Sequence, residues 1–207
     1  MIYTELPIEG NGKLLIWNAI ESIDDLLSEI QHPETIADFQ KITTTKRQFE
    51  FLSVRVALKK LLGNEFYIFY TAAGKPFLHE NCFNISISHS GKWIVVAVHP
   101  SLNIGVDIER PTDKIGIVYK RFLSEREQKD LSQGADIRQL QIAWSAKEAL
   151  YKIIGKEAVD FATQQRIYPF EINGESGELT LEHTVTGKLY NMHYFQNADY
   201  TLVYCIS

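Results

Sequence analysis

Two long helical segments, each placed between strand-like segments, constrain most strongly what this 207-residue chain can fold into. The first, Thr43 to Leu62, carries apolar residues at helical spacing and stops at Gly63, a residue typical of helix C-termini. The second, Asp136 to Ile154, stops at Gly155 in the same way. The order of strand, helices and strands thus occurs twice along the chain, which predicts an α+β fold built from two similar halves.

The expected boundary lies near residue 100, which gives an N-terminal half of residues 1–100 and a C-terminal half of residues 101–207. Each half has the size of a small domain. Shorter helices are expected to begin at Ser22 and at Ser124, where Ser124 and Glu127 form a capping-box pattern. The expected strands are Lys13–Ala19, Phe66–Thr71, Phe83–Ser88, Trp93–His99, Ile104–Glu109, Ile167–Ile172, Glu178–Leu181, Lys188–Phe195 and Tyr200–Ile206.

The charge and composition exclude several classes of partner. A net charge of −5 does not favour nucleic acid or an anionic membrane surface, and no apolar stretch approaches the roughly 18 residues that cross a bilayer. The N-terminal stretch lacks the pattern of a secretory signal, so we expect a cytoplasmic protein. Cys82 and Cys205 are far apart and in no CxxC spacing, and a buried thiol is expected for each.

Two acidic residues share one face of the strand that is expected to end at Glu109. Asp107 and Glu109 are two positions apart, so their side chains leave the same face of the strand. Val106 and Ile108 then point the other way, into the core. Two carboxylates on one face repel each other unless a cation lies between them, and their hard oxygen atoms suit Mg²⁺. A solvated strand end beside Arg110-Pro111 explains the same spacing equally well.

A third acidic residue lies on the second long helix. Trp144, Glu148 and Lys152 are four residues apart and share one stripe of that helix. An ordinary Glu148–Lys152 ion pair accounts for this spacing. Because the helix is otherwise largely apolar, Glu148 can also lie at the edge of a buried surface, where it would complete a magnesium site with Asp107 and Glu109.

Four short motifs follow one another between residues 74 and 152, a little over a third of the chain. They are Gly74-Lys75-Pro76, Ser86-Ile87-Ser88-His89-Ser90-Gly91, Ile104-Gly105-Val106-Asp107-Ile108-Glu109 and Trp144-Ser145-Ala146-Lys147-Glu148-Ala149-Leu150-Tyr151-Lys152. Each motif alone is weak, but in this order and spacing they resemble the 4′-phosphopantetheinyl transferases. The resemblance is to the long single-chain type that activates peptide synthetases (surfactin-synthetase-activating, Sfp-like). Glu50 to Arg55 and Phe122 to Glu125 fit this family more loosely.

The resemblance implies a pseudo-twofold pair of α+β halves with the active site in the cleft between them. It also implies a reaction: the 4′-phosphopantetheine of coenzyme A is transferred to a serine of an apo acyl or peptidyl carrier protein, with Mg²⁺, and 3′,5′-ADP is released. Asp107, Glu109 and Glu148 would hold the metal ion. Glu148 would also accept the serine proton, and Lys152 would stabilise the departing phosphate.

The resemblance further implies where coenzyme A binds. Lys75 and the turn before it would contact the nucleotide end, and Ser88 and His89 would bind phosphate. Arg47 and Arg55 are further candidates for the 3′-phosphate. Taken without the family, His89 fits a solvent-exposed turn and Arg47 fits a solvated helix face.

A carrier protein is the expected partner beside coenzyme A, and the protein is expected to be a monomer. The family's carriers are acidic helical bundles, so docking on an acidic enzyme calls for an apolar contact or a basic strip. One segment combines both, although a solvated loop explains it as well; its residues are Lys114, Lys120, Arg121, Phe122 and Leu123.

One position departs from the family pattern, and three other functions stay open. Glu157 stands where the family often carries the second glycine of a Gly-Lys-Gly-Leu turn. Another Mg²⁺-dependent enzyme acting on phosphate esters could use the same three acids. A non-catalytic scaffold could bind coenzyme A or a carrier protein. A purely structural domain would leave the order of the motifs to coincidence.

Overall fold

The computed structural model describes residues 3–79, 82–131, 136–155 and 160–207. The chain divides into two compact units, Met1–Leu102 and Asn103–Ser207. Glu157, the position that departs from the family pattern, lies outside the described residues. Among the helices that are described, none is long and apolar enough to cross a membrane.

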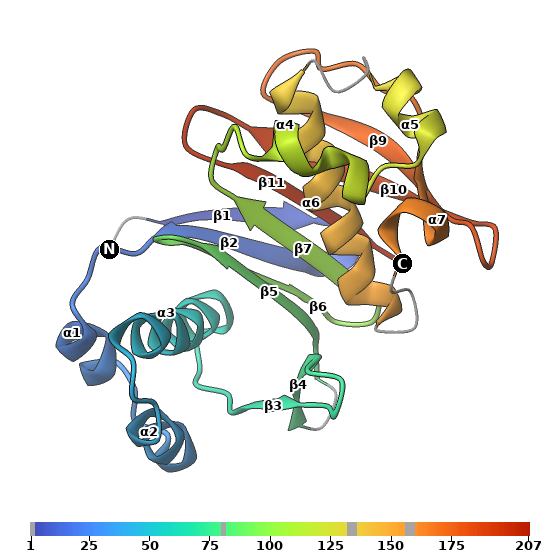
Figure 1. Ribbon diagram of the computed structural model, residues 1–207. Helices are drawn as coiled ribbons and strands as arrows, with labels where there is room; N and C mark the ends of the chain where they lie inside the picture. The colour runs from blue at the N-terminus through green and yellow to red at the C-terminus, as the bar shows by residue number, and fades with distance from the viewer. Residues whose placement is uncertain (1–2, 80–81, 132–135, 156–159) are drawn as a thin grey trace. The chain divides into compact units, whose positions relative to one another are not determined.

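The first unit is a four-stranded antiparallel sheet with helices packed on it (Figure 1). Its strands pair in the order β1 (Tyr3–Ile8), β2 (Gly12–Asn18), β6 (Trp93–His99) and β5 (Asn84–Ser90). Its helices are α1 (Ile23–Ser28), α2 (Pro33–Gln40) and α3 (Thr45–Leu62). The apolar core lies where α3 packs against β2 and β6. A separate two-stranded ribbon consists of β3 (Ile68–Tyr70) and β4 (Pro76–Leu78).

Local sequence signals set the ends of these elements. The Ser22 hydroxyl and the Asp25 carboxylate form a capping box at the start of α1, and Gly63 ends α3 with a left-handed φ of 75°. Because Ser90 pairs directly with Trp93, the β5–β6 turn is only two residues long. His89 therefore lies on strand β5, and the expectation that it belongs to a turn is wrong.

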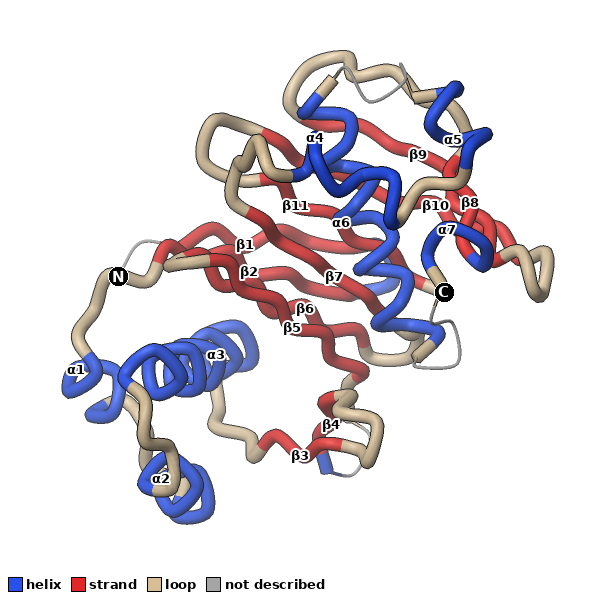
Figure 2. Tube along the Cα trace, viewed as in Figure 1, coloured by secondary structure: helices blue, strands red, loops and turns tan. Residues whose placement is uncertain are grey.

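The second unit is a five-stranded antiparallel sheet with α6 packed along one face; Figure 2 shows the strands in red. The strands pair in the order β7 (Ile104–Glu109), β11 (Thr201–Ile206), β10 (Lys188–Gln196), β9 (Ser176–His183) and β8 (Gln165–Ile167). The helical elements are α4 (Ile115–Val118), the 3₁₀ turn η3 (Tyr119–Arg121), α5 (Glu125–Asp130), α6 (Ile137–Ile154) and α7 (Phe161–Gln164). The core lies between α6 and the sheet.

The α+β class is confirmed, and the corrections concern weakly patterned segments. The Ser124–Glu127 capping box is present at the start of α5 as expected. The elements not predicted from the sequence include β1, α2, β4, α4, η3 and α7. The strand expected at Ile167–Ile172 is wrong beyond Ile167, where Pro169 follows shortly and cannot donate a ladder hydrogen bond. Cys205 is buried as expected, but Cys82 is exposed on the connection between β4 and β5.

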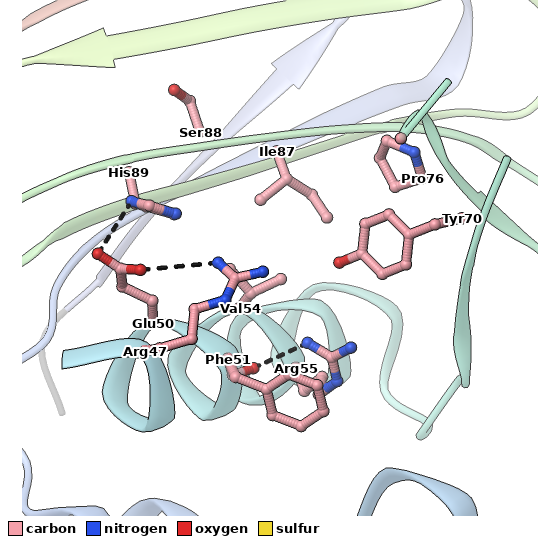
Figure 3. A pocket seen from close by; sticks show the side chains of 11 residues that line it. Arg47, Glu50, Phe51, Val54, Arg55, Tyr70, Pro76, Ile87, Ser88 and His89 are labelled. Atoms are coloured by element: carbon pink, nitrogen blue, oxygen red, sulfur yellow. Dashed lines mark hydrogen bonds and ion pairs between the residues drawn. The ribbon is translucent and has the colours of Figure 1, made fainter. Parts of the chain in front are cut away.

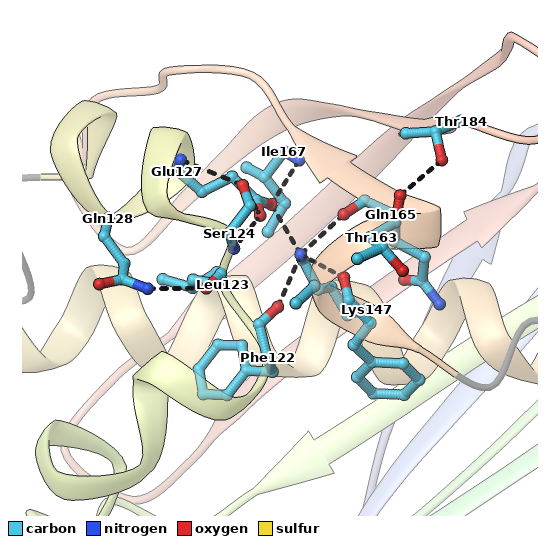
Figure 4. Close-up of polar contacts among 12 residues, drawn as sticks. Phe122, Leu123, Ser124, Glu127, Gln128, Lys147, Thr163, Gln165, Ile167 and Thr184 are labelled. Carbon is cyan, nitrogen blue, oxygen red and sulfur yellow. Dashed lines mark hydrogen bonds and ion pairs between the residues drawn. The ribbon is translucent and has the colours of Figure 1, made fainter.

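Lys147, on α6, holds several elements of the second unit together (Figure 4). Its side chain is fully buried, and its Nζ lies 2.7 Å from Glu127 Oε1. The same Nζ donates hydrogen bonds of 2.8 Å to the carbonyl oxygens of Phe122, Phe161 and Gln165. Burial lowers the pKa of the Lys147 ammonium to about 8, and the neighbouring Glu127 carboxylate opposes that shift.

The Glu127 carboxylate also accepts hydrogen bonds from backbone N–H groups. Its Oε1 accepts the backbone N–H of Ile167 at 2.9 Å, and its Oε2 accepts the backbone N–H of Ser124 at 2.8 Å. A buried ion pair stabilises a fold only when the remaining polar groups of both partners are hydrogen-bonded, and this condition is met here. The pair therefore links α5, α6, α7 and β8.

We expect Lys147→Met to lower the stability of the protein by about 3–5 kcal/mol, because it leaves the Glu127 carboxylate buried without a cation. Thermal and urea unfolding monitored by circular dichroism measure the loss. Lys41→Met is the matched control, since Lys41 pairs with Asp38 at the surface, and it should change stability by less than about 1 kcal/mol. Equal effects of the two substitutions would contradict this account.

Candidate functional site

The strand β7 presents Asp107 and Glu109 on the face of the sheet that α6 covers. Asp107 pairs in register with Val203 and is only 4% exposed, while Glu109 is half-buried. Val106 and Ile108, on the opposite face, are fully buried. Asp107 is therefore not part of a solvated strand end, and that explanation of the sequence spacing is wrong for it.

Gly105 allows α6 to approach β7 closely enough for their side chains to meet. A Cβ atom at this position would lie 2.0 Å from the carbonyl oxygen of Ala149, so any larger residue must push the helix and the strand apart. The position of the glycine, two residues before Asp107, thus places the acidic strand directly under the helix that carries Glu148.

The stripe of Trp144, Glu148 and Lys152 lies along one side of α6, and all three residues are half-buried. Lys152 Nζ donates to the Val106 carbonyl oxygen at 2.7 Å and to Asp107 Oδ1 at 2.9 Å. The ammonium group of this helix is thereby directed at the acidic strand. A simple surface pair of Glu148 with Lys152 does not describe this arrangement.

The pKa of Glu148 is affected by its burial and by the negative charges on β7. Burial raises the pKa of its carboxyl group to about 7; the charge of Asp107 adds to the rise, that of Lys152 opposes it, and that of Glu109 adds a smaller increase. The three predicted acids are thus coupled electrostatically within the second unit. Such mutual repulsion is what a bound cation would relieve.

Within the described ranges, no group of three or more His, Cys, Asp or Glu residues is gathered closely enough to hold a metal ion. The donor chemistry nevertheless fits Mg²⁺, since all three acids offer hard oxygen atoms. Mg²⁺ is commonly held by one or two carboxylates together with substrate phosphates, rather than by a closed protein cage. The three-acid metal site therefore stays a prediction.

A second group of predicted residues comes together in a basic pocket of the first unit (Figure 3). Arg47 and Arg55 face it from α3, and His89 faces it from β5; Ser88 also lines the pocket, but Figure 3 shows its side chain on the opposite side of the strand. Gly74 and Pro76 also line this pocket, and Lys75 lies between them in the β3–β4 connection. The other lining residues are Glu50, Phe51, Val54, Tyr70 and Ile87.

Arg55 is the most buried cation of this pocket, at 6% exposure. Its Nη1 donates to the Phe51 carbonyl oxygen at 3.0 Å, and its guanidinium carbon lies 3.3 Å from the centroid of the Phe51 ring. Burial lowers the pKa of Arg55, and the contact with Tyr70 opposes the shift. An arginine keeps its charge under these conditions, so the pocket retains a fixed cation suited to phosphate.

Glu50, a carboxylate that lines this otherwise basic pocket, was not predicted from the sequence. Glu50 follows Lys46 by four residues and Arg47 by three on α3, and this spacing would have indicated ion pairs. The Arg47 side chain is 59% exposed, as expected for a solvated helix face, and its guanidinium also lies 3.6 Å from the Glu50 carboxylate.

The segment expected to dock a carrier protein is exposed in only some of its residues. Phe122 and Leu123 are 2% and 1% exposed, so the expectation that they contribute an apolar surface is wrong. The Phe122 ring packs edge-on against Trp144, which removes it from the surface. Ile117 on α4 is instead 80% exposed, close in sequence to the exposed Lys120.

We expect Gly105→Ala to destabilise the protein by about 1–3 kcal/mol, because the added methyl group meets a backbone carbonyl that cannot move independently. The unfolding midpoint in urea measures the change. Gly116→Ala is the matched control: its added methyl group would meet only the flexible end of the Ile137 side chain. If Gly105→Ala were as stable as Gly116→Ala, the close approach of α6 and β7 would be refuted.

Comparison with known protein families gives a match that lies within the second unit. The sequence profile of the 4′-phosphopantetheinyl transferase superfamily (ACPS) matches residues 103–205. The chain is 39% identical over 89 residues to the 4′-phosphopantetheinyl transferase psf-1 of Bacillus pumilus, covering 40% of this chain and 37% of that protein. It is 42% identical over 89 residues to the 4′-phosphopantetheinyl transferase of Bacillus subtilis, covering 40% and 38%.

A longer match is weaker in identity. The 4′-phosphopantetheinyl transferase HetI of a Nostoc species is 28% identical over 149 residues, which cover 64% of this chain and 62% of HetI. The chain spans only about 37–38% of the length of the two Bacillus proteins. The family profile covers β7 and α6, the two elements that bring Asp107 and Glu148 together. The chain belongs to the 4′-phosphopantetheinyl transferase superfamily.

Proposed function

We propose that this protein transfers the 4′-phosphopantetheine moiety of coenzyme A to a serine hydroxyl of an apo acyl or peptidyl carrier protein, with the help of Mg²⁺. The observation that carries the proposal is the family match over residues 103–205. This stretch contains the coupled acids of β7 and α6 together with Lys152, which contacts one of them.

The basic pocket of the first unit is proposed to bind the 3′-phosphate of coenzyme A. Its two arginines supply positive charge, and the His89 imidazole and the backbone around Ser88 add polar groups to the lining. Lys75, between two residues that line the pocket, is proposed to contact the same nucleotide. A protein with a net charge of −5 needs such a local basic cluster to bind so anionic a ligand.

The acids of the second unit are proposed to act at the pyrophosphate. Asp107, Glu109 and Glu148 would hold Mg²⁺, which neutralises negative charge on the pyrophosphate when bound. The serine oxygen forms a bond to the β-phosphorus, and the bond from that phosphorus to the oxygen of the nucleotide breaks, releasing 3′,5′-ADP. Glu148 would accept the serine proton, directly or through a water, and Lys152 would stabilise the charge on the departing phosphate.

We expect incubation of the protein with an apo carrier protein, coenzyme A and Mg²⁺ to add the mass of one phosphopantetheine to the carrier. Intact-mass spectrometry measures the gain, and EDTA should abolish it. Asp107→Ala should abolish it too, while Asp113→Ala, which changes an exposed acid just after β7, should not.

Glu148→Gln should lower kcat by about 10²–10⁴ if Glu148 is the general base.

Two results would favour other functions. Release of inorganic phosphate from phosphate esters, without modification of any carrier, would indicate a different Mg²⁺-dependent enzyme. Binding of coenzyme A without transfer to several unrelated carriers would indicate a scaffold. Normal turnover by Glu148→Gln would remove Glu148 as the base and leave the class of reaction intact.

The short helix α4 is proposed to contribute to docking of the carrier. Ile117 is the most exposed large apolar residue in the described part of the chain, at 80%. Lys114 precedes α4, and Lys120 and Arg121 follow in η3, so the apolar residue has basic neighbours along the chain. An acidic helical carrier is complementary to such a mixed surface.

We expect Ile117→Asp to raise the KM for the carrier protein by about tenfold, because it places a negative charge where an acidic partner would make an apolar contact. Steady-state kinetics with varied carrier concentration measure the effect, and the KM for coenzyme A should not change. Val185→Asp is the matched control, at a 67% exposed apolar residue in the β9–β10 turn. A similar rise for both variants would refute docking at α4.

A further inference from the structure

Glu50 is a buried carboxylate among the cations of the basic pocket. Its side chain is 11% exposed, and it lies near the side chains of Lys46, Arg47 and His89, the last two of which Figure 3 shows beside it. Its Oε2 lies 3.6 Å from Arg47 Nη1, and its Oε1 lies 3.7 Å from both Lys46 Nζ and His89 Nδ1. The two helical partners come from the first turns of α3, and His89 comes from β5.

These partners include the groups that the pocket offers to a ligand phosphate. Arg47 and His89 both line the pocket, and so does Glu50 itself. A buried carboxylate requires compensating charge, and Glu50 obtains it from Lys46 and Arg47, while the His89 imidazole also lies near its Oε1. A phosphate that enters the pocket must therefore share or take over the cations that now compensate Glu50.

The contribution of Glu50 to holding the cations in place is small. All three contacts are longer than a hydrogen bond, and the side chains of Lys46 and Arg47 are 86% and 59% exposed. The electrostatic effect of Glu50 on a bound phosphate is larger, because the charge of a buried carboxylate is screened little by water and salt. Repulsion between this carboxylate and a phosphate dianion therefore outweighs the weak positioning of the cations.

We propose that Glu50 is an internal counter-ion that limits the affinity of the basic pocket for phosphate. The carboxylate competes with the ligand phosphate for Arg47 and His89, and it repels the phosphate once bound. The identity of the ligand, a nucleotide 3′-phosphate, rests on the proposed function; the competition itself rests on the contacts of Glu50.

The competition has a consequence for turnover. The 3′-phosphate takes no part in bond making, so substrate and product carry it unchanged and the pocket binds both through it. Tight binding of a group common to substrate and product does not accelerate the chemical step, and it slows product release. By weakening binding of the 3′-phosphate, the Glu50 counter-ion speeds the release of the product 3′,5′-ADP.

Glu50→Gln tests the proposal, because glutamine keeps the size of the side chain and removes its charge. We expect the Kd for adenosine 3′,5′-bisphosphate, measured by isothermal titration, to fall about tenfold. The gain should be much smaller with adenosine 5′-phosphate, which lacks the 3′-phosphate. Glu5→Gln removes the same charge from an exposed position on β1 of the same unit and should leave both values unchanged.

A second variant and a second measurement guard against misfolding of Glu50→Gln. Glu50→Ala should show the same direction of change, and in both variants the ligand should raise the unfolding midpoint by more than in the unmodified protein. Equal or weaker binding by folded Glu50 variants, with binding by the unmodified protein retained, would overturn the counter-ion and leave the proposed function standing. Absence of binding by the unmodified protein would overturn the phosphate pocket, and the counter-ion with it.

Discussion

The buried contact between Lys147 and Glu127 is the interaction on which the second unit depends. One ammonium group satisfies a carboxylate and three backbone carbonyls that belong to separate segments of the chain. Because Lys147 must point inward to do so, the rotation of α6 about its axis is fixed. Glu148 is the next residue, so the same rotation also fixes the direction of its side chain, and burial together with the charge of Asp107 raises its pKa. The structural and the candidate catalytic residues of this helix are therefore set by one constraint.

The elements that could be predicted are those whose signals are local. Capping residues at Ser22 and Ser124, and the glycines that end α3 and α6, fix helix ends without reference to the rest of the chain. The alternation in β7 predicted correctly that Asp107 and Glu109 share a face. Motif order was sufficient to anticipate the family, and it led to Ser88 and His89 as residues of the basic pocket. Arg47 and Arg55, named as further candidates outside the ordered motifs, line the same pocket.

What could not be predicted depends on partners far away in the sequence. The local sequence does not distinguish Lys147 from Lys152, yet Lys147 is fully buried and Lys152 is half-buried. The difference arises because only Lys147 contacts Glu127 and three backbone carbonyls from distant parts of the chain. Phe122 looked like a surface residue beside Lys120 and Arg121, and its burial follows from packing against Trp144. The contacts of Glu50 could not be predicted for the same reason, since one of its partners, His89, lies on a strand 39 positions later.

The contact of Gly105 with the Ala149 carbonyl also bears on how the acidic site can move. With no side chain between them, the strand and the helix touch backbone to backbone and have little freedom to slide past each other. Any change in the distance between the carboxylates of Asp107 and Glu148 must then come mainly from torsions of their side chains. The range of positions open to these acids is therefore limited to the reach of about two or three rotatable bonds in each side chain.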